Sequence, residues 1–155
     1  MKKLFISLLL GCSFLVVNKA AAAEQPDLLI KLQRDIFTEM IRSHGPQIEN
    51  QTVLNWCQHN DLADEIGLTV NGLKRAVYDS FIVAGSQNVQ ATEIARQMSD
   101  DEWDLYNNAL FSDIRHYRTG IKKGLEISLA NKPAREKFCK QAEQQAMKTA
   151  QTITH

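Results

Sequence analysis

Catalytic motifs are the first thing that this sequence lacks. It contains no HExxH zinc motif, no GxSxG nucleophile elbow, no CxxCH haem-attachment motif and no calcium-binding loop. Its three cysteines include no CxxC pair, which argues against redox catalysis and against a zinc site. We therefore expect no catalytic residue, no cofactor and no metal ion, and we interpret the chain as a protein that is not an enzyme.

A strong net charge is also missing. The chain carries 18 basic and 18 acidic side chains, whereas a nucleic-acid-binding domain is usually strongly basic. Removing residues 1–23 would take away Lys2, Lys3 and Lys19 and no acid, which leaves 15 basic residues against 18 acidic ones. We therefore expect no nucleic-acid partner.

The N-terminal 23 residues have the layout of a secretory signal peptide. Lys2 and Lys3 precede an apolar run over residues 4–17, and four alanines at residues 20–23 precede Glu24. The run is too short for a membrane span, which needs about 20 apolar residues. We expect cleavage near Ala23, so that residues 24–155 work in the bacterial periplasm as a single domain.

A lipoprotein signal is the alternative interpretation of the same segment. Residues 9–12 read Leu-Leu-Gly-Cys, and Cys12 would then be lipidated and would anchor the protein to a membrane. Against this interpretation, residues 13–17 stay apolar after the cysteine, and the alanine site is well formed. The sequence favours soluble export, with membrane association only if Cys12 carries lipid.

Two cysteines remain after export, Cys57 and Cys139. An even number of cysteines in an oxidising compartment predicts a disulfide. The bridge would close a loop of about 80 residues and, by chain entropy, would stabilise the fold by roughly 4–5 kcal/mol. The alternative is a pair of buried free thiols.

Apolar residues at helical spacing predict an all-α fold, because no segment shows the alternation of a strand. The first helix starts at Asp27 and stops at Gly45–Pro46, as expected from the N-cap and breaker rules. The other predicted elements are short helices near residues 53–57, 62–66 and 91–98, a helix between Thr69 and Gly85, a long helix near 100–129, and a last helix after Pro133. We expect a bundle of about five to six helices, clasped by the disulfide.

The helix near 100–129 is predicted to be the longest. Ser99 and Glu102 form a capping box at its start. An apolar stripe follows, with steps of three and four residues, from Trp103 to Leu125. Gly120 and Gly124 lie one turn apart within it, and each costs about 1 kcal/mol relative to alanine. Close packing against a neighbouring helix is the expected compensation.

Residues 62–76 resemble the helix-turn-helix of DNA-binding regulators. Ala63, the turn residue Gly67 and the apolar positions of the second helix match that motif, whereas Gly72 departs from it. The resemblance implies a recognition helix in the major groove. Only Lys74 and Arg75 add basic charge there, so we interpret the segment as a tight structural corner.

Two polar groups are candidate sites. His59, Asp61, Asp64 and Glu65 cluster in sequence and could ligate a metal, although such residues are common around a helix corner.

The second candidate site is basic. Arg115, Arg118 and Lys122 lie at i, i+3 and i+7 on one side of the long helix, and we call them the basic strip. It could bind an acidic protein, a lipid headgroup or an anionic wall polymer, or could simply be a solvated helix face.

These features together favour a binding role. In architecture such a domain resembles the helical accessory proteins of secretion and pilus machines, including pilotins, which implies a protein partner in the cell envelope. The first alternative is a periplasmic immunity protein or inhibitor, which would need a protruding tip such as residues 86–88 or 45–50. The second is a periplasmic chaperone with a large exposed apolar patch. The partner and the oligomeric state stay open.

Overall fold

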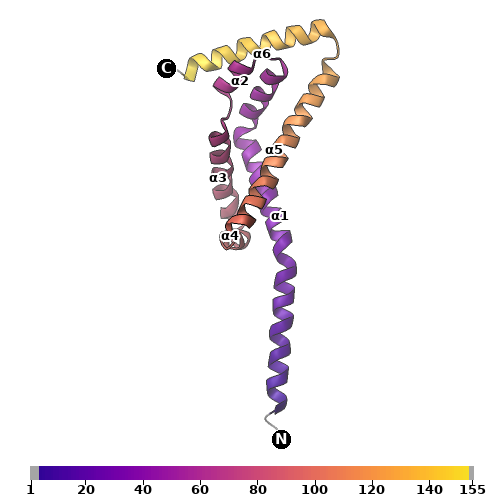
Figure 1. Cartoon of the computed structure of the whole chain (residues 1–155), viewed down its shortest axis with the longest axis vertical. Helices are drawn as coiled ribbons and strands as arrows, with labels where there is room; N and C mark the ends of the chain where they lie inside the picture. The colour runs from indigo at the N-terminus through magenta and orange to yellow at the C-terminus, as the bar shows by residue number, and fades with distance from the viewer. Residues whose placement is uncertain (1–3, 154–155) are drawn as a thin grey trace.

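The computed structural model describes the backbone of residues 4–153 and the side chains of residues 26–152. In that part of the chain it contains six helices and no strand (Figure 1). The helices are α1 (Leu4–Trp56), α2 (Asn60–Ile66), α3 (Val70–Gln87), α4 (Val89–Arg96), α5 (Asp100–Ser128) and α6 (Lys132–Ile153). The predicted all-α bundle is confirmed. The expected signal peptide lies outside the described side chains, so its boundary at Ala23 stays a prediction.

Helix α1 is the centre of the bundle, because all five other helices contact it. Its inward face carries Leu32, Ile36, Met40 and Ile48, which are fully buried and recur at multiples of four residues. Side chains from α3, α4 and α5 complete this main core. In Figure 1, α3 and α5 run beside α1, and α6 lies across the end of the bundle.

The predicted boundaries of the first helix are wrong. Asp27 lies inside α1, and the helix continues through Gly45 and Pro46 to Trp56, so residues 53–56 form its last turn. Proline inside a helix removes a backbone hydrogen bond and costs about 3 kcal/mol. Pro46 is exposed, however, and the fully buried Met40 and Ile48 lie on either side of it. Packing of both halves against one core therefore outweighs the local preference for a break.

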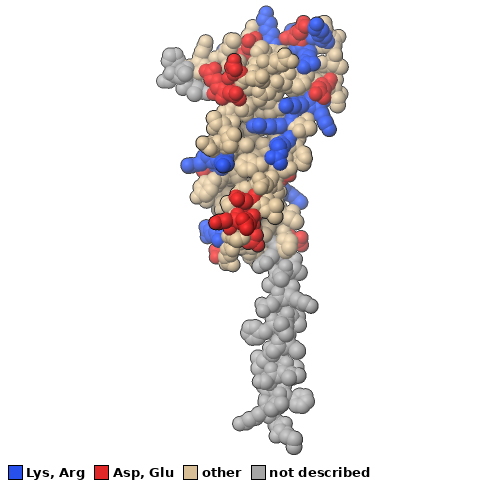
Figure 2. Space-filling view, viewed as in Figure 1, with Lys and Arg blue, Asp and Glu red and all other residues tan. Residues whose placement is uncertain are grey.

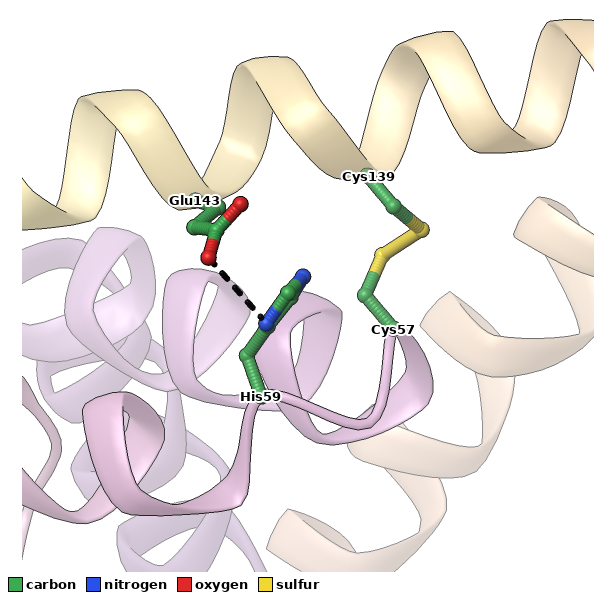
Figure 3. The surroundings of a disulfide bond; sticks show 4 residues. All are labelled: Cys57, His59, Cys139 and Glu143. Carbon is green, nitrogen blue, oxygen red and sulfur yellow. Dashed lines mark ion pairs between the residues drawn. A yellow bond between two sulfur atoms is a disulfide. The ribbon is translucent and has the colours of Figure 1, made fainter.

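The predicted disulfide is confirmed. Cys57 follows the end of α1 and Cys139 lies in α6, with their Cα atoms 5.5 Å apart (Figure 3). Next to the bridge, a second and smaller core joins α1, α2 and α6. Its buried members are Leu54, Ala63, Ile66 and Ala146. Helix α6 is thus joined to the bundle by a covalent bond and by this smaller core, to which it contributes only alanine side chains.

The long helix predicted near residues 100–129 is confirmed as α5, including the capping box at Ser99 and Glu102. It is not the longest helix, since α1 has 53 residues and α5 has 29. The expected close packing at Gly120 and Gly124 is also wrong, because a Cβ atom added at either position would have no described atom within 4 Å. Towards its C-terminal end, α5 leans away from α1 (Figure 1).

Helix α3 begins as predicted and ends later. The side chain of Thr69 accepts a hydrogen bond from the backbone N–H of Gly72 at 3.0 Å, so Thr69 is the N-cap. The helix continues past Gly85 to Gln87. Gly85 is buried where α3 meets α4, and a Cβ atom there would crowd the side chain of Thr92. The glycine is therefore needed for close packing and does not stop the helix.

Candidate functional site

A surface groove runs between α3 and α5. Both helices pack on α1, and the space between them measures about 490 Å³. Its floor is apolar and includes Ile36 of α1, Val77 of α3 and Leu110 of α5. At one end, the edge of the Phe81 ring meets Trp103 with the ring centroids 5.5 Å apart. This contact closes the groove where α3 and α5 approach each other.

The interior of the groove is aromatic. Trp103 stacks on Tyr106, with the ring centroids 5.7 Å apart, and Phe111 lines the wall further along α5. The hydroxyl of Tyr106 donates a hydrogen bond of 3.5 Å to the carbonyl of Leu29. Burial, together with the negative charge of Asp35, raises the pKa of Tyr106 above its ordinary value. Its phenol therefore stays protonated and holds α5 against α1.

The rim of the groove combines polar and apolar groups. Lys74 of α3 and Asp104 and Asn108 of α5 supply charges and an amide. Tyr78 is 56% exposed on the same side of α3, and Ile82, one turn later, is 52% exposed. An apolar centre surrounded by hydrogen-bonding groups is the usual composition of a protein-binding surface.

The basic strip is not uniform. Arg115 and Lys122 are exposed, whereas Arg118 is partly buried and its Nη2 atom donates a 2.9 Å hydrogen bond to Oε1 of Gln51 in α1. Burial lowers the pKa of Arg118 below its ordinary value. Figure 2 shows basic side chains along the middle and C-terminal half of α5 and acidic ones gathered over its start. The strip therefore consists of two solvated cations and one that reaches into the fold.

The side-chain amide of Gln51, which accepts the hydrogen bond from Arg118, is itself held in place. Gln51 is only 7% exposed, and its Nε2 atom donates a hydrogen bond of 3.4 Å to the carbonyl of Leu68. One turn earlier in α1, Gln47 donates to the carbonyl of Ile66 at 3.0 Å. Both carbonyls belong to the corner between α2 and α3. Arg118 is thereby fixed where α5, α1 and this corner meet.

Of the residues considered for a metal site, His59, Asp61 and Glu65 line one surface pocket together with Glu143 of α6. His59 faces Glu143 of α6, with Nδ1 and Oε1 3.7 Å apart, beside the disulfide (Figure 3). Among the described residues, no group of three or more histidine, cysteine, aspartate or glutamate side chains is placed to hold a metal ion. His59 instead adds a polar contact between α6 and the rest of the fold.

The segment that resembles a helix-turn-helix divides between the two cores. Ala63 and Ile66 of α2 pack with α6 in the smaller core, whereas Ala76 and Val77 of α3 belong to the main core. On the outer side of α3, Arg75 is paired with Asp79 at 2.9 Å. This arrangement agrees with the interpretation of the segment as a structural corner.

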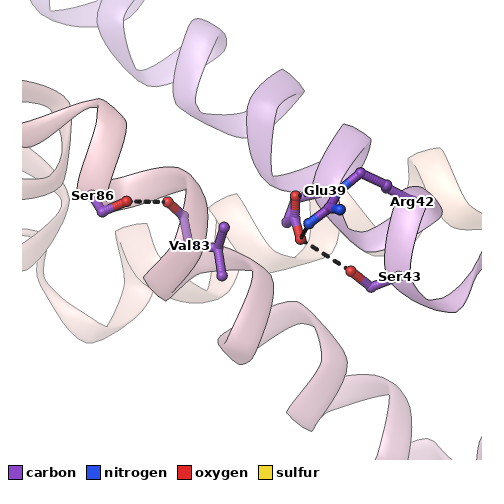
Figure 4. Close-up of polar contacts among 5 residues, drawn as sticks. All are labelled: Glu39, Arg42, Ser43, Val83 and Ser86. Carbon is purple, nitrogen blue, oxygen red and sulfur yellow. Dashed lines mark hydrogen bonds and ion pairs between the residues drawn. The ribbon is translucent and has the colours of Figure 1, made fainter.

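The two segments proposed as protruding tips lie inside helices except for Asn88, which separates α3 from α4. Residues 45–50 lie inside α1, and Ser86 is in the last turn of α3, where its hydroxyl donates to the carbonyl of Val83 at 2.7 Å (Figure 4). Asn88 donates to the carboxylate of Asp35 at 2.9 Å and is held against α1. Glu39 of α1, which is partly buried, accepts hydrogen bonds from Arg42 and Ser43, and these bonds lower the pKa of Glu39 (Figure 4). The expectation of a loop at residues 45–50 is therefore wrong, whereas residues 86–88 lie at the C-terminal end of α3, where Ser86 and Gln87 are exposed.

Comparison with models of known protein families, with curated proteins and with solved structures found no match. Within the part of the chain that the structure describes, no helix is both long enough and apolar enough to cross a membrane. The groove between α3 and α5 combines an apolar floor, aromatic walls and a polar rim. It was missed at the sequence level, because its aromatic residues have the same spacing as ordinary core residues.

Proposed function

We propose that this chain is an exported, non-catalytic accessory protein of the bacterial cell envelope, of the secretion or pilus type, that binds another protein in the groove between α3 and α5. The observation that carries the proposal is an open, aromatic groove whose rim includes the exposed Tyr78. Grooves between helices commonly accept an amphipathic segment of a partner. Tyrosine and tryptophan contribute a large share of the binding energy at such surfaces.

Export is supported by the leader and by the disulfide. A Cys57–Cys139 bridge fits an oxidising compartment, in which disulfides persist. With residues 1–23 removed, Pro26 would lie in the first turn of the shortened helix, a position that suits proline. We infer that the mature protein begins near Glu24 and works in the periplasm.

Site-specific photocrosslinking tests the proposed function. A photoreactive amino acid at position 78 should form a covalent adduct with one envelope protein in living cells. Ile30 is the matched control, because it is also 56% exposed but lines a separate pocket between α1 and α5 that shares no residue with the groove. An adduct at position 78 and none at position 30 would support the proposal. Equal labelling at both positions, or none at either, would refute it.

The same experiment separates the alternatives. A periplasmic chaperone should give many adducts of different mass at position 78, because it would bind many unfolded chains. An immunity protein or inhibitor should give one adduct, with a toxin or a cell-wall hydrolase. We rank that alternative below the accessory role, because the segments expected to form its inhibitory tips are held within helices or against α1.

A further inference from the structure

Arg118 is a partly buried cation without a counter-charge. No described carboxylate lies within ion-pair distance of it, and its one hydrogen bond among the described residues goes to the neutral amide of Gln51. Its Nε atom is shielded from solvent and has no hydrogen-bond partner among the described residues. A desolvated charge of this kind is costly unless an anion pairs with it. The unpaired guanidinium therefore requires an explanation.

The position of Arg118 relates it to the groove. It follows Phe111 by seven residues, so it lies on the same face of α5 about 10 Å further along the helix. Phe81 and Trp103 close the opposite end. A segment lying in the groove and continuing along α5 would thus pass from aromatic rings to a fixed guanidinium. About three residues of extended chain span that distance.

We propose that the groove selects an acidic, apolar segment of the partner protein, and that Arg118 binds its carboxylate. This inference rests on the proposed function and names the chemistry that its groove recognises. The segment would place apolar side chains against Trp103 and Phe111, and an aspartate, a glutamate or a C-terminal carboxylate on Arg118. The planar guanidinium can present its terminal Nη groups to a carboxylate in charge-assisted hydrogen bonds, whereas its Nε atom is shielded from solvent.

The rim favours a protein segment over a lipid as the source of the carboxylate. Lys74, Asp104, Asn107 and Asn108 stand along the opening and can hydrogen-bond to a peptide backbone. A fatty acid offers no such partners along its chain. The exposed Arg115 and Lys122 flank Arg118 and would attract an acidic segment at longer range.

Matched peptide pools test the inference directly. One pool of blocked peptides carries random Leu, Ile, Val and Phe at three positions, followed by Ala-Ala-Glu, and the other pool ends in Ala-Ala-Gln. We expect the wild-type chain to retain the Glu pool about tenfold better than the Gln pool, the effect of one added charge-assisted pair. Fluorescence of Trp103 in a Trp56→Phe background should change on binding, because Trp103 lines the groove. Equal retention of the two pools, or retention of neither, would overturn the inference.

Variants assign the preference to Arg118. Arg118→Gln should abolish the preference for the Glu pool while the melting temperature stays the same or rises, because an unpaired charge is removed. Arg118→Lys, which keeps the charge but loses the planar guanidinium, should retain part of the preference. Arg115→Gln is the matched control, because Arg115 is exposed and lies one turn away. This variant should keep most of the preference for the Glu pool. A preference that survives Arg118→Gln would contradict the assignment.

Two further arms separate the possible failures. Octanoate that bound better than the Glu pool would make a fatty acid the preferred ligand and would overturn the choice of a protein segment. Crosslinking from position 78, repeated in Arg118→Gln, distinguishes this inference from the proposed function. An undiminished adduct would refute the role of Arg118 and leave the protein-binding function standing, whereas a wild-type chain without any adduct would refute that function itself.

Discussion

Gly67 and Gly120 have opposite surroundings. A Cβ atom at Gly67 would overlap the backbone carbonyl of Ala63 and the side chain of Gln51. At Gly120 no described atom lies within 4 Å of the added Cβ. A backbone carbonyl inside a helix cannot move aside cheaply, whereas open space on a helix tolerates any small side chain. Substitution by alanine should therefore change the free energy of unfolding in opposite directions at the two positions.

Gly67→Ala is expected to lower the free energy of unfolding by about 1–3 kcal/mol, the usual cost of overpacking. Gly120→Ala should raise it by about 0.5–1 kcal/mol, because alanine loses less conformational entropy in a helix. Urea denaturation of both variants and the wild type measures the difference. Loss of stability in Gly120→Ala would mean that this face of α5 is covered in solution.

The two glycines also mark what sequence reasoning can reach at this scale. The requirement at Gly67 was predicted from its spacing after Ala63, because both residues belong to one tight corner. The expectation for Gly120 and Gly124 was wrong, because it assumed a neighbouring helix. Local chain geometry is encoded in adjacent residues, whereas the presence of a distant neighbour is not.

At the level of the element, the start of α5 is stabilised by an ionised carboxylate. Glu102 accepts a 2.8 Å hydrogen bond from the backbone N–H of Ser99 and another from its hydroxyl. These bonds lower the pKa of Glu102 from its ordinary value of 4.5. A lowered pKa in the folded state means that the stabilisation is present above pH 4.5 and is lost as the pH falls through the lower value.

Glu102→Gln should therefore remove part of the pH dependence of stability. The variant is expected to be less stable than the wild type at pH 6, and the difference should shrink towards pH 3, where the carboxyl group of the wild type also becomes neutral. Urea denaturation at several pH values measures this difference. Glu126→Gln, an exposed position near the other end of α5, is the control. A difference independent of pH would assign the effect to helix propensity alone.

Helix boundaries were predictable where a side chain caps the chain and unpredictable where packing decides. Thr69 and Ser99 begin α3 and α5 as their local sequences indicate. Pro46 has the local sequence of a helix end, yet α1 continues through it, because Met40 and Ile48 both belong to the central core. Caps act within four residues, but the energy that keeps α1 intact comes from α3 and α5.

For the whole molecule, the disulfide determines how firmly α6 is attached. Ala146 is the one buried residue of α6 within the described part of that helix. Small side chains bury little apolar area, so non-covalent contact alone holds α6 weakly. The bridge joins residues 82 positions apart and restricts the unfolded chain accordingly.

Cys139→Ser is expected to lower the melting temperature, with a loss of up to about 4–5 kcal/mol by the loop-entropy relation. Most of the helix content should remain, because the main core does not involve α6. Amide exchange measured by mass spectrometry should accelerate in α6 and change little in α3 and α5. Cys57→Ser should behave in the same way, and an unchanged melting temperature in both variants would contradict the clasp.

The candidate site combines residues that the sequence separates widely. The basic strip was identified from the spacing of Arg115, Arg118 and Lys122, but the burial of Arg118 depends on Gln51, 67 positions away. The groove likewise depends on α3 and α5 packing on the same side of α1. Helical periodicity tells which face of each helix is apolar, but it does not tell which two faces leave a gap. The groove could therefore be found only in the folded molecule.

Both the Cys57–Cys139 disulfide and a protein partner in the cell envelope require that the chain is exported. Intact-mass analysis of the protein released from the periplasm should give a chain that begins near Glu24. Its unreduced mass should be lower than its reduced mass by two hydrogen atoms, because Cys57 and Cys139 are joined.

The variant Cys12→Ser separates soluble export from lipidation. If the leader is removed at the alanine site, the substitution should leave both masses and the localisation unchanged. If Cys12 carries lipid, the substitution should release the protein from the membrane. Bulky residues in place of Ala21 and Ala23 should block cleavage. A full-length chain with free thiols in the cytosol would contradict export, and the bridge would then have no oxidising compartment in which to persist.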